Sequence, residues 1–98
     1  MTAPAVDEAE AKVTAGLAWL DQNHPGWPDR IDLDVLDIED PLSCVLGQTV
    51  GDFWLVPISY DEATAMGFEV PPGDPGRIEL TEAWRRAIEE RQLAGASR

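Results

Sequence analysis

Proline and glycine divide this chain into short segments, and this division is the strongest limit on its fold. Proline cannot continue a helix, and glycine permits a left-handed exit from one. Such breaks occur at Pro25-Gly26, at Pro57 and throughout residues 71–76. Between the breaks, apolar residues recur at helical spacing. A chain of 98 residues divided in this way predicts one domain built from short helices.

The first helix is predicted over residues 7–23. Asp7 and Glu10 have the spacing of a capping box at its start. His24 follows at its C-terminus, where we expect it to lie against the helix dipole rather than to bind a metal. The apolar stripe of this helix consists of Val13, Leu17 and Leu20.

A second helix is predicted over residues 41–55, with Asp40 at the N-cap and Pro41 at the first helical position. Gly47 and Gly51 each cost about 1 kcal/mol inside a helix, so we expect another group to approach closely there. The apolar residues of this segment share one face: Leu42, Val45, Leu46, Val50, Phe53 and Trp54.

Two further helices are predicted over residues 61–67, with Asp61 as the cap and Gly67 as the stop, and over residues 81–93, with Thr81 as the cap. In the last helix, arginines and glutamates stand four residues apart and predict ion pairs along the helix, such as Arg85 with Glu89.

The predicted fold is mainly α, a small single-domain bundle of three main helices and one short helix. Residues 31–38 fit both the alternation of a strand and the spacing of a helical face, and we expect a short extended or turn-like segment whose apolar residues pack on the core. A small β-hairpin between residues 68–70 and 77–80 is the alternative, and it would make the fold α+β. Residues 1–5 and 95–98 are expected to be flexible ends.

Charge is distributed unevenly along the chain. The net charge is −12, and residues 31–76 hold ten acidic residues with no lysine or arginine. Such a field repels nucleic acid and acidic membranes and attracts basic partners. The same acids would also serve as a solubilising surface. No segment resembles a signal peptide or a membrane span, and a cytoplasmic location is the expectation.

The residue inventory argues against catalysis. The chain holds one His, one Cys and one Lys, and it lacks a nucleophile elbow, a phosphate-binding loop and a zinc-ligand pair. The acids from Asp32 onward imitate the start of a calcium loop, but Asp37 stands where that loop needs glycine, and Ser43 stands at its twelfth position. We therefore predict a non-enzyme with no cofactor and no metal, whose Cys44 is a small buried hydrophobe.

Partner binding is the class of function that remains after catalysis and metal binding, and we consider two forms of it. In one, carboxylates imitate the phosphates of a duplex and occupy a nucleic-acid-binding protein. In the other, an exposed Trp27 or Trp54 anchors a protein interface while acids steer association. Trp19 and Trp84 are expected in the core. The acidic candidates are Asp32, Asp34, Asp37, Glu39, Asp40, Asp52, Asp61 and Glu62.

Several short runs resemble a group of small proteins from high-GC actinobacteria and their phages. These runs are Pro25-Gly26-Trp27, Arg30-Ile31-Asp32-Leu33, Leu36-Asp37, Cys44-Val45-Leu46-Gly47-Gln48 with Gly51, and Leu80-Thr81 with Ala83-Trp84-Arg85. The group has no established activity, so the resemblance implies only a small accessory protein, phage- or prophage-borne.

From the residues and the resemblance together, we expect an acidic protein-binding module that inhibits a basic host protein, with nucleic-acid mimicry as one route. The alternative is an acidic structural or accessory protein, self-assembling into homo-oligomers, whose charge has no binding role.

Overall fold

The computed structural model describes residues 4–40, 42–51, 56–70 and 76–96. Helices account for most of these residues, and no strand occurs among them. The predicted mainly helical fold is confirmed, and the alternative with a β-hairpin is wrong for the described residues. The elements in chain order are α1 (Pro4–Asn23), the 3₁₀ helix η1 (Trp27–Arg30), α2 (Val45–Val50), α3 (Tyr60–Ala65) and α4 (Arg77–Ala96).

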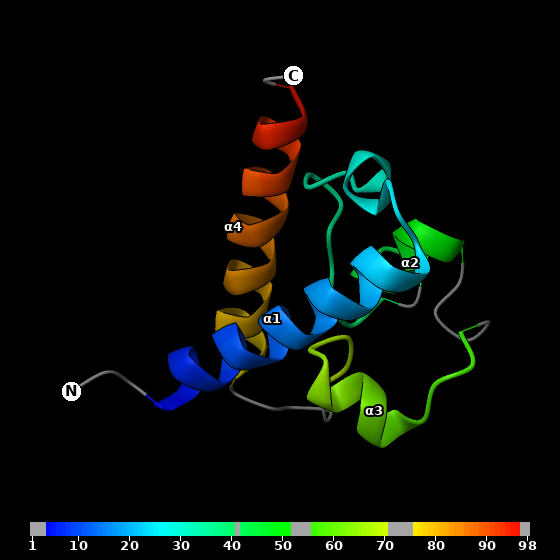
Figure 1. Cartoon of the computed structure of the whole chain (residues 1–98). Helices are drawn as coiled ribbons and strands as arrows, with labels where there is room; N and C mark the ends of the chain where they lie inside the picture. Colours follow the sequence, from blue (N-terminus) through cyan, green and yellow to red (C-terminus); the bar gives the residue numbers. More distant parts are fainter. Residues whose placement is uncertain (1–3, 41, 52–55, 71–75, 97–98) are drawn as a thin grey trace.

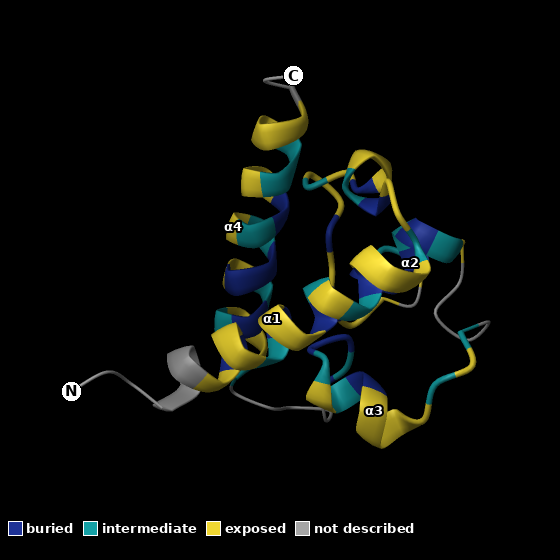
Figure 2. Cartoon of the chain, in the orientation of Figure 1, coloured by how far each residue is buried: buried dark blue, intermediate teal, exposed yellow. Residues whose placement is uncertain are grey.

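The two long helices, α1 and α4, cross each other and make the most extensive contact between elements (Figure 1). Leu20 of α1 and Trp84 and Ile88 of α4 are fully buried. Phe68, which follows α3, stacks on the Trp84 ring with the ring centroids 5.5 Å apart. The apolar stripes read from the sequence are therefore the faces that the two helices bury (Figure 2).

Close contact between α1 and the end of α3 depends on Gly16. A Cβ atom added there would overlap the carbonyl oxygen of Met66 and lie 2.8 Å from the Trp84 ring. The backbone of α1 therefore lies directly against both groups. The Trp84 indole N–H donates to the carbonyl of Gly67 at 2.7 Å, which joins α4 to the same turn.

Helix α1 ends at Asn23, as the break at Pro25-Gly26 predicted, and Gly26 has φ +87°. Its start differs from the prediction, because the helix begins at Pro4 rather than at Asp7. Proline lacks an N–H and fits the first turn of a helix, where that group has no partner. Residues 4–5 are thus helical, although we expected a flexible end, and α4 likewise extends through residues 95–96.

The second helix is shorter than predicted. Helix α2 begins at Val45, and the Cys44 thiol accepts a hydrogen bond from the Gly47 N–H at 3.2 Å as its N-cap. It ends at Gly51, whose φ of +97° is left-handed. Asp40 instead caps the preceding turn, where its carboxylate accepts from the Leu42 N–H at 2.8 Å. Residues 52–55 lie outside the described residues.

Helix α3 is capped by Ser59 rather than Asp61, because Ser59 and Glu62 form a reciprocal capping box. It ends as predicted, with Gly67 at φ +75° and the Phe68 N–H donating back to the Ala63 carbonyl. The predicted hairpin over residues 77–80 is replaced by the first turn of α4. That turn places Leu80 on the same buried stripe as Trp84 and Ile88, which explains the earlier helix start.

Candidate functional site

Residues 31–40 and 42–44 lie between η1 and α2 in a loop that carries five of the predicted acidic residues. Three of its apolar side chains, those of Ile31, Leu36 and Ile38, are buried in the core, whereas Val35 and Leu42 are exposed. Its carboxylates point outward, and all five are exposed. We call residues 32–40 the acidic loop; its carboxylates are Asp32, Asp34, Asp37, Glu39 and Asp40.

Aspartates organise the backbone of this loop from within. The Asp32 carboxylate accepts from the Asp34 N–H at 2.9 Å, and the Asp37 carboxylate accepts from the Glu39 N–H at 3.0 Å. With the turn at Asp40, three aspartates each bind an amide two residues further on, as in Asx turns. This local bonding holds residues 31–38 in the turn-like form that was expected, with neither a helix nor a strand among them.

Side chains from the helices hold the loop from outside. Gln48 of α2 accepts from the Asp32 N–H at 2.6 Å and donates to the carbonyls of Asp32 and Ser43, at 3.2 and 2.9 Å. Arg85 of α4 donates to the Leu33 carbonyl at 3.0 Å, rather than pairing with Glu89. Gln92 of α4 donates to the Ile31 carbonyl at 2.8 Å. The start of the acidic loop, and Ser43 just beyond its end, are therefore fastened to α2 and α4.

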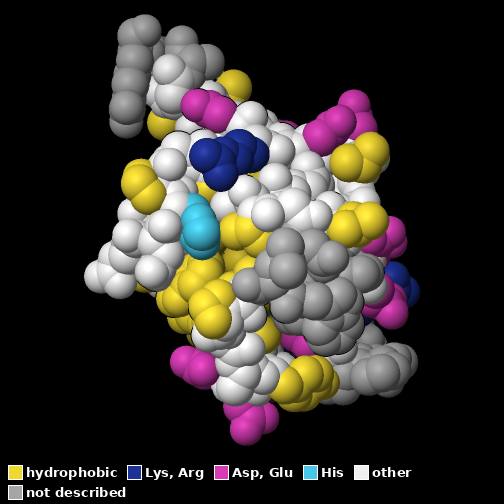
Figure 3. Space-filling view, turned by 90° about the vertical axis from the view of Figure 1, so that its right-hand side faces the viewer, with side chains coloured by type: hydrophobic (Ala, Val, Ile, Leu, Met, Phe, Trp, Pro, Cys, Tyr) yellow, Lys and Arg dark blue, Asp and Glu magenta, His cyan; other side chains and the backbone are white. Residues whose placement is uncertain are grey.

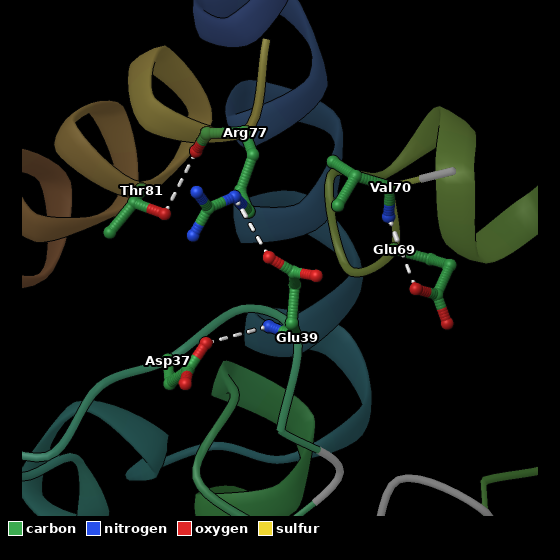
Figure 4. Close-up of polar contacts among 6 residues, drawn as sticks. All are labelled: Asp37, Glu39, Glu69, Val70, Arg77 and Thr81. Carbon is green, nitrogen blue, oxygen red and sulfur yellow. Dashed lines mark hydrogen bonds and ion pairs between the residues drawn. The ribbon is translucent and has the colours of Figure 1, made fainter. Parts of the chain in front are cut away.

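One carboxylate of the acidic loop is engaged by a cation. Glu39 meets the Arg77 guanidinium at the start of α4 at 2.8 Å, with both side chains nearly half exposed (Figure 4). Among the described residues, the four aspartates of the loop have no such ion pair. Their charge therefore faces solvent.

The remaining acidic candidates belong elsewhere in the fold. Asp61 and Glu62 lie in the first turn of α3, and the described contacts join neither to the acidic loop. The Ser59 backbone N–H donates to Glu62 and lowers the pKa of that carboxyl. Figure 3 shows carboxylates placed apart around one face of the molecule. Asp52 and Trp54 lie outside the described residues.

Trp27 is not the exposed aromatic that the sequence suggested. It is fully buried, its ring meets the Trp84 ring edge-on at 6.4 Å, and its indole N–H donates to the Asp21 carboxylate at 3.1 Å. The reason is η1, which turns back after Gly26 and places Trp27 against α4. Trp27 therefore stabilises the core and cannot anchor a partner in this structure.

Cys44 and His24 offer little chemistry in their surroundings. Cys44 is buried, and desolvation raises the pKa of its thiol, which disfavours the reactive thiolate. His24 lies 5.4 Å from the Trp19 ring, centroid to centroid. Within the described residues, no three His, Cys, Asp or Glu side chains are arranged to hold a metal ion.

The sequence analysis did not identify Gln48, Arg85 and Gln92 as the residues that hold the acidic loop. No feature of the sequence marks Gln48 for this role, because the burial of its neighbours Gly47 and Thr49 is seen only in the structure.

None of the described helices combines the length and apolar character needed to cross a membrane. Comparison with family models, curated proteins and solved structures finds no match to this chain.

Proposed function

We propose that this chain is a non-enzymatic binding module that recruits a basic protein through its acidic loop. One observation supports the proposal most: four aspartates point into solvent from a loop whose backbone is held by side chains of α2 and α4. A site that is already ordered loses less conformational entropy on binding. The surrounding charge of −12 raises the rate at which basic partners arrive.

The partner class follows from this charge. A lysine- or arginine-rich surface, as on a nucleic-acid-binding host protein, complements the acidic loop. Inhibition of such a protein by nucleic-acid mimicry is the narrower form of the proposal, and a phage- or prophage-borne inhibitor would act in this way. Mimicry requires that binding weaken steeply with salt, because it imitates a contact that releases counterions.

The test replaces Asp32, Asp34, Asp37 and Asp40 together with asparagine. Asparagine keeps the side-chain oxygen that accepts the amide in an Asx turn, so the loop keeps its bonds while losing four charges. The net charge changes from −12 to −8. The matched control replaces four exposed acidic residues outside the acidic loop with their amides: Glu8, Asp29, Glu82 and Glu89.

Wild type and both variants serve as baits in a bacterial lysate at low and high salt, with retained proteins identified by mass spectrometry. We expect wild type and the control to retain basic proteins at low salt and the asparagine variant to lose them. If both variants retain basic proteins to the same extent, whether fully or not at all, the charges of the acidic loop have no special role and the proposal would fail.

A second candidate has its own supporting observation. Asp32, Asp37 and Asp40 each bind a backbone amide, Glu39 binds Arg77, and Glu62 caps α3. Acidic side chains that stabilise the fold in this way are what we expect of an accessory protein whose charge has no binding role. Retention of no protein by any bait would favour this second candidate, and sedimentation of the wild type would then show whether it self-assembles.

A further inference from the structure

The two long helices form a groove on one side of their crossing, with a volume of about 260 Å³. Each helix contributes four residues at the spacing i, i+3, i+4 and i+7, so the groove follows one face of each. We call it the α1/α4 groove; its residues are Glu10, Val13, Thr14 and Leu17 of α1, and Ala83, Arg86, Ala87 and Glu90 of α4.

The floor of the α1/α4 groove is apolar. Val13 and Ala83 are buried, while Leu17 and Ala87 are partly buried and pack against the core. The α4 side is recessed because both of its apolar residues are alanines. Residues 10 to 17 of α1 span about 10 Å along the helix axis, or two helical turns. A floor of this length accommodates two apolar side chains of a docked helix.

The rim of the groove is acidic overall. It carries two carboxylates, Glu10 and Glu90, and one guanidinium, Arg86. The charged groups of Glu10 and Arg86 are 3.8 Å apart, and both side chains are more than 60% exposed. This ion pair is therefore weak, and a cation of a partner can replace Arg86 beside Glu10.

The other arginines of α4 do not offset this charge. Arg77 binds Glu39, Arg85 binds the Leu33 carbonyl, and Arg91 binds Asp21 through two hydrogen bonds of 2.8 and 3.0 Å. Within the described part of the chain, Glu90 therefore meets no cation. The groove combines an apolar floor with a net negative rim.

We propose that the α1/α4 groove docks a basic amphipathic helix of a partner protein. The apolar face of that helix would cover the floor, and its lysine or arginine side chains would reach Glu10 and Glu90. Recognition of an amphipathic helix in a hydrophobic groove is a recurring mode of protein binding. The net charge of −12 disfavours an acidic helix and a second copy of this chain as occupants. No groove residue belongs to the acidic loop, so this inference goes beyond the proposed function.

The experiment measures fluorescence anisotropy of labelled model peptides about 15 residues long, a length at which helices begin to form. One peptide places leucine and lysine on opposite faces, a second replaces its lysines with glutamate, and a third replaces its leucines with glutamine. We expect the full-length protein to bind the first peptide and neither of the others. Equal binding of the first and third peptides would mean that charge alone acts and would overturn the proposal.

Matched variants locate the site. Ala87→Phe fills the floor of the groove and should weaken binding of the leucine–lysine peptide at least about tenfold, whereas Ala18→Phe, on an exposed position of α1, should not. Replacing Glu10 and Glu90 with glutamine should weaken binding several-fold at low salt and little at high salt, because salt already screens the rim. The same change at Glu8 and Glu89 is the control.

Backbone amide shifts in NMR spectra keep the proposal testable even if Ala87→Phe perturbs folding. On adding the peptide to wild type, shifts confined to residues 10–17 and 83–90 would support the groove. Shifts confined to residues 32–40 would overturn this inference while supporting the acidic loop as the binding surface. Concentration-dependent dimers of wild type without peptide would overturn it in favour of a second copy.

Discussion

At the scale of single residues, Gly16 shows how one missing side chain permits the packing of three elements. Alanine favours a helix over glycine by up to about 1 kcal/mol, so propensity alone predicts that Gly16→Ala stabilises α1. The new methyl group would overlap the Met66 carbonyl oxygen and the Trp84 ring. Overpacking of this kind costs about 1–3 kcal/mol. We expect the packing cost to exceed the helical gain.

The measurement is the free energy of unfolding from urea titration, which should fall by up to about 2 kcal/mol in Gly16→Ala, the overpacking cost less the propensity gain. Gly95→Ala is the matched control, because it lies in α4 with nothing within 4 Å of the added Cβ. This control should leave stability unchanged or raise it slightly. A stabilised Gly16→Ala would show that α1 and α3 separate more easily than the structure implies.

At the scale of elements, the acidic loop depends on Gln48 of α2 for its geometry. The Gln48 amide makes three hydrogen bonds, to the N–H and carbonyl of Asp32 and to the carbonyl of Ser43. This amide therefore joins the first residue of the acidic loop to the turn before α2. Gln48→Ala should lower the free energy of unfolding by about 0.5–1.5 kcal/mol, the usual net contribution of a hydrogen bond, because water can replace the two exposed bonds to Asp32.

Hydrogen exchange separates this local effect from general destabilisation. The Asp32 amide should exchange much faster in Gln48→Ala, while amides in the middle of α4 change only with global stability. Gln48→Glu should restore protection at Asp32 only in part, because a carboxylate can still accept from the Asp32 N–H but cannot donate to the two carbonyls. Gln22→Ala, on an exposed position of α1, is the control. Unchanged exchange at Asp32 would contradict the role of Gln48.

At the scale of the whole molecule, Asp21 ties together α1, η1 and α4. It receives two hydrogen bonds from Arg91 and one from the Trp27 indole. The hydrogen bond from Arg91 is the main cause that lowers the pKa of Asp21, although burial opposes it. A carboxyl whose pKa is lower in the folded state stabilises the fold above its unfolded pKa, and this contribution disappears as the pH falls through the folded pKa.

We therefore expect Asp21→Asn to lower stability at neutral pH by up to about 1 kcal/mol, the range for exposed pairs, since both side chains are partly exposed. The difference from wild type should close as the pH falls below about 3.9, the usual Asp pKa. Thermal unfolding followed across this range by circular dichroism is the measurement. Asp29→Asn, at an exposed site of η1, is the control. A constant difference at all pH values would mean that the charge of Asp21 contributes nothing.

Local sequence patterns were sufficient to predict which helical faces are buried and where several helices end. Leu20 and Trp84 are buried where the periodicity placed them, and Gly26 and Gly67 turn the chain where left-handed exits were expected. These features depend on neighbours three or four residues away, whose interactions the sequence displays directly. The mainly helical fold class rests on the same local information.

Tertiary contacts decided the rest. Trp27 follows a turn and so suggested an exposed anchor, yet contact with α4 buries it. The acidic loop is shaped by Gln48 and by Arg85, which lies 52 residues from its partner Leu33. A side chain chooses between a nearby glutamate and a distant carbonyl only after the chain has folded, because burial decides which polar groups need a partner. The sequence alone determined which faces are apolar; the tertiary structure determined what each face meets.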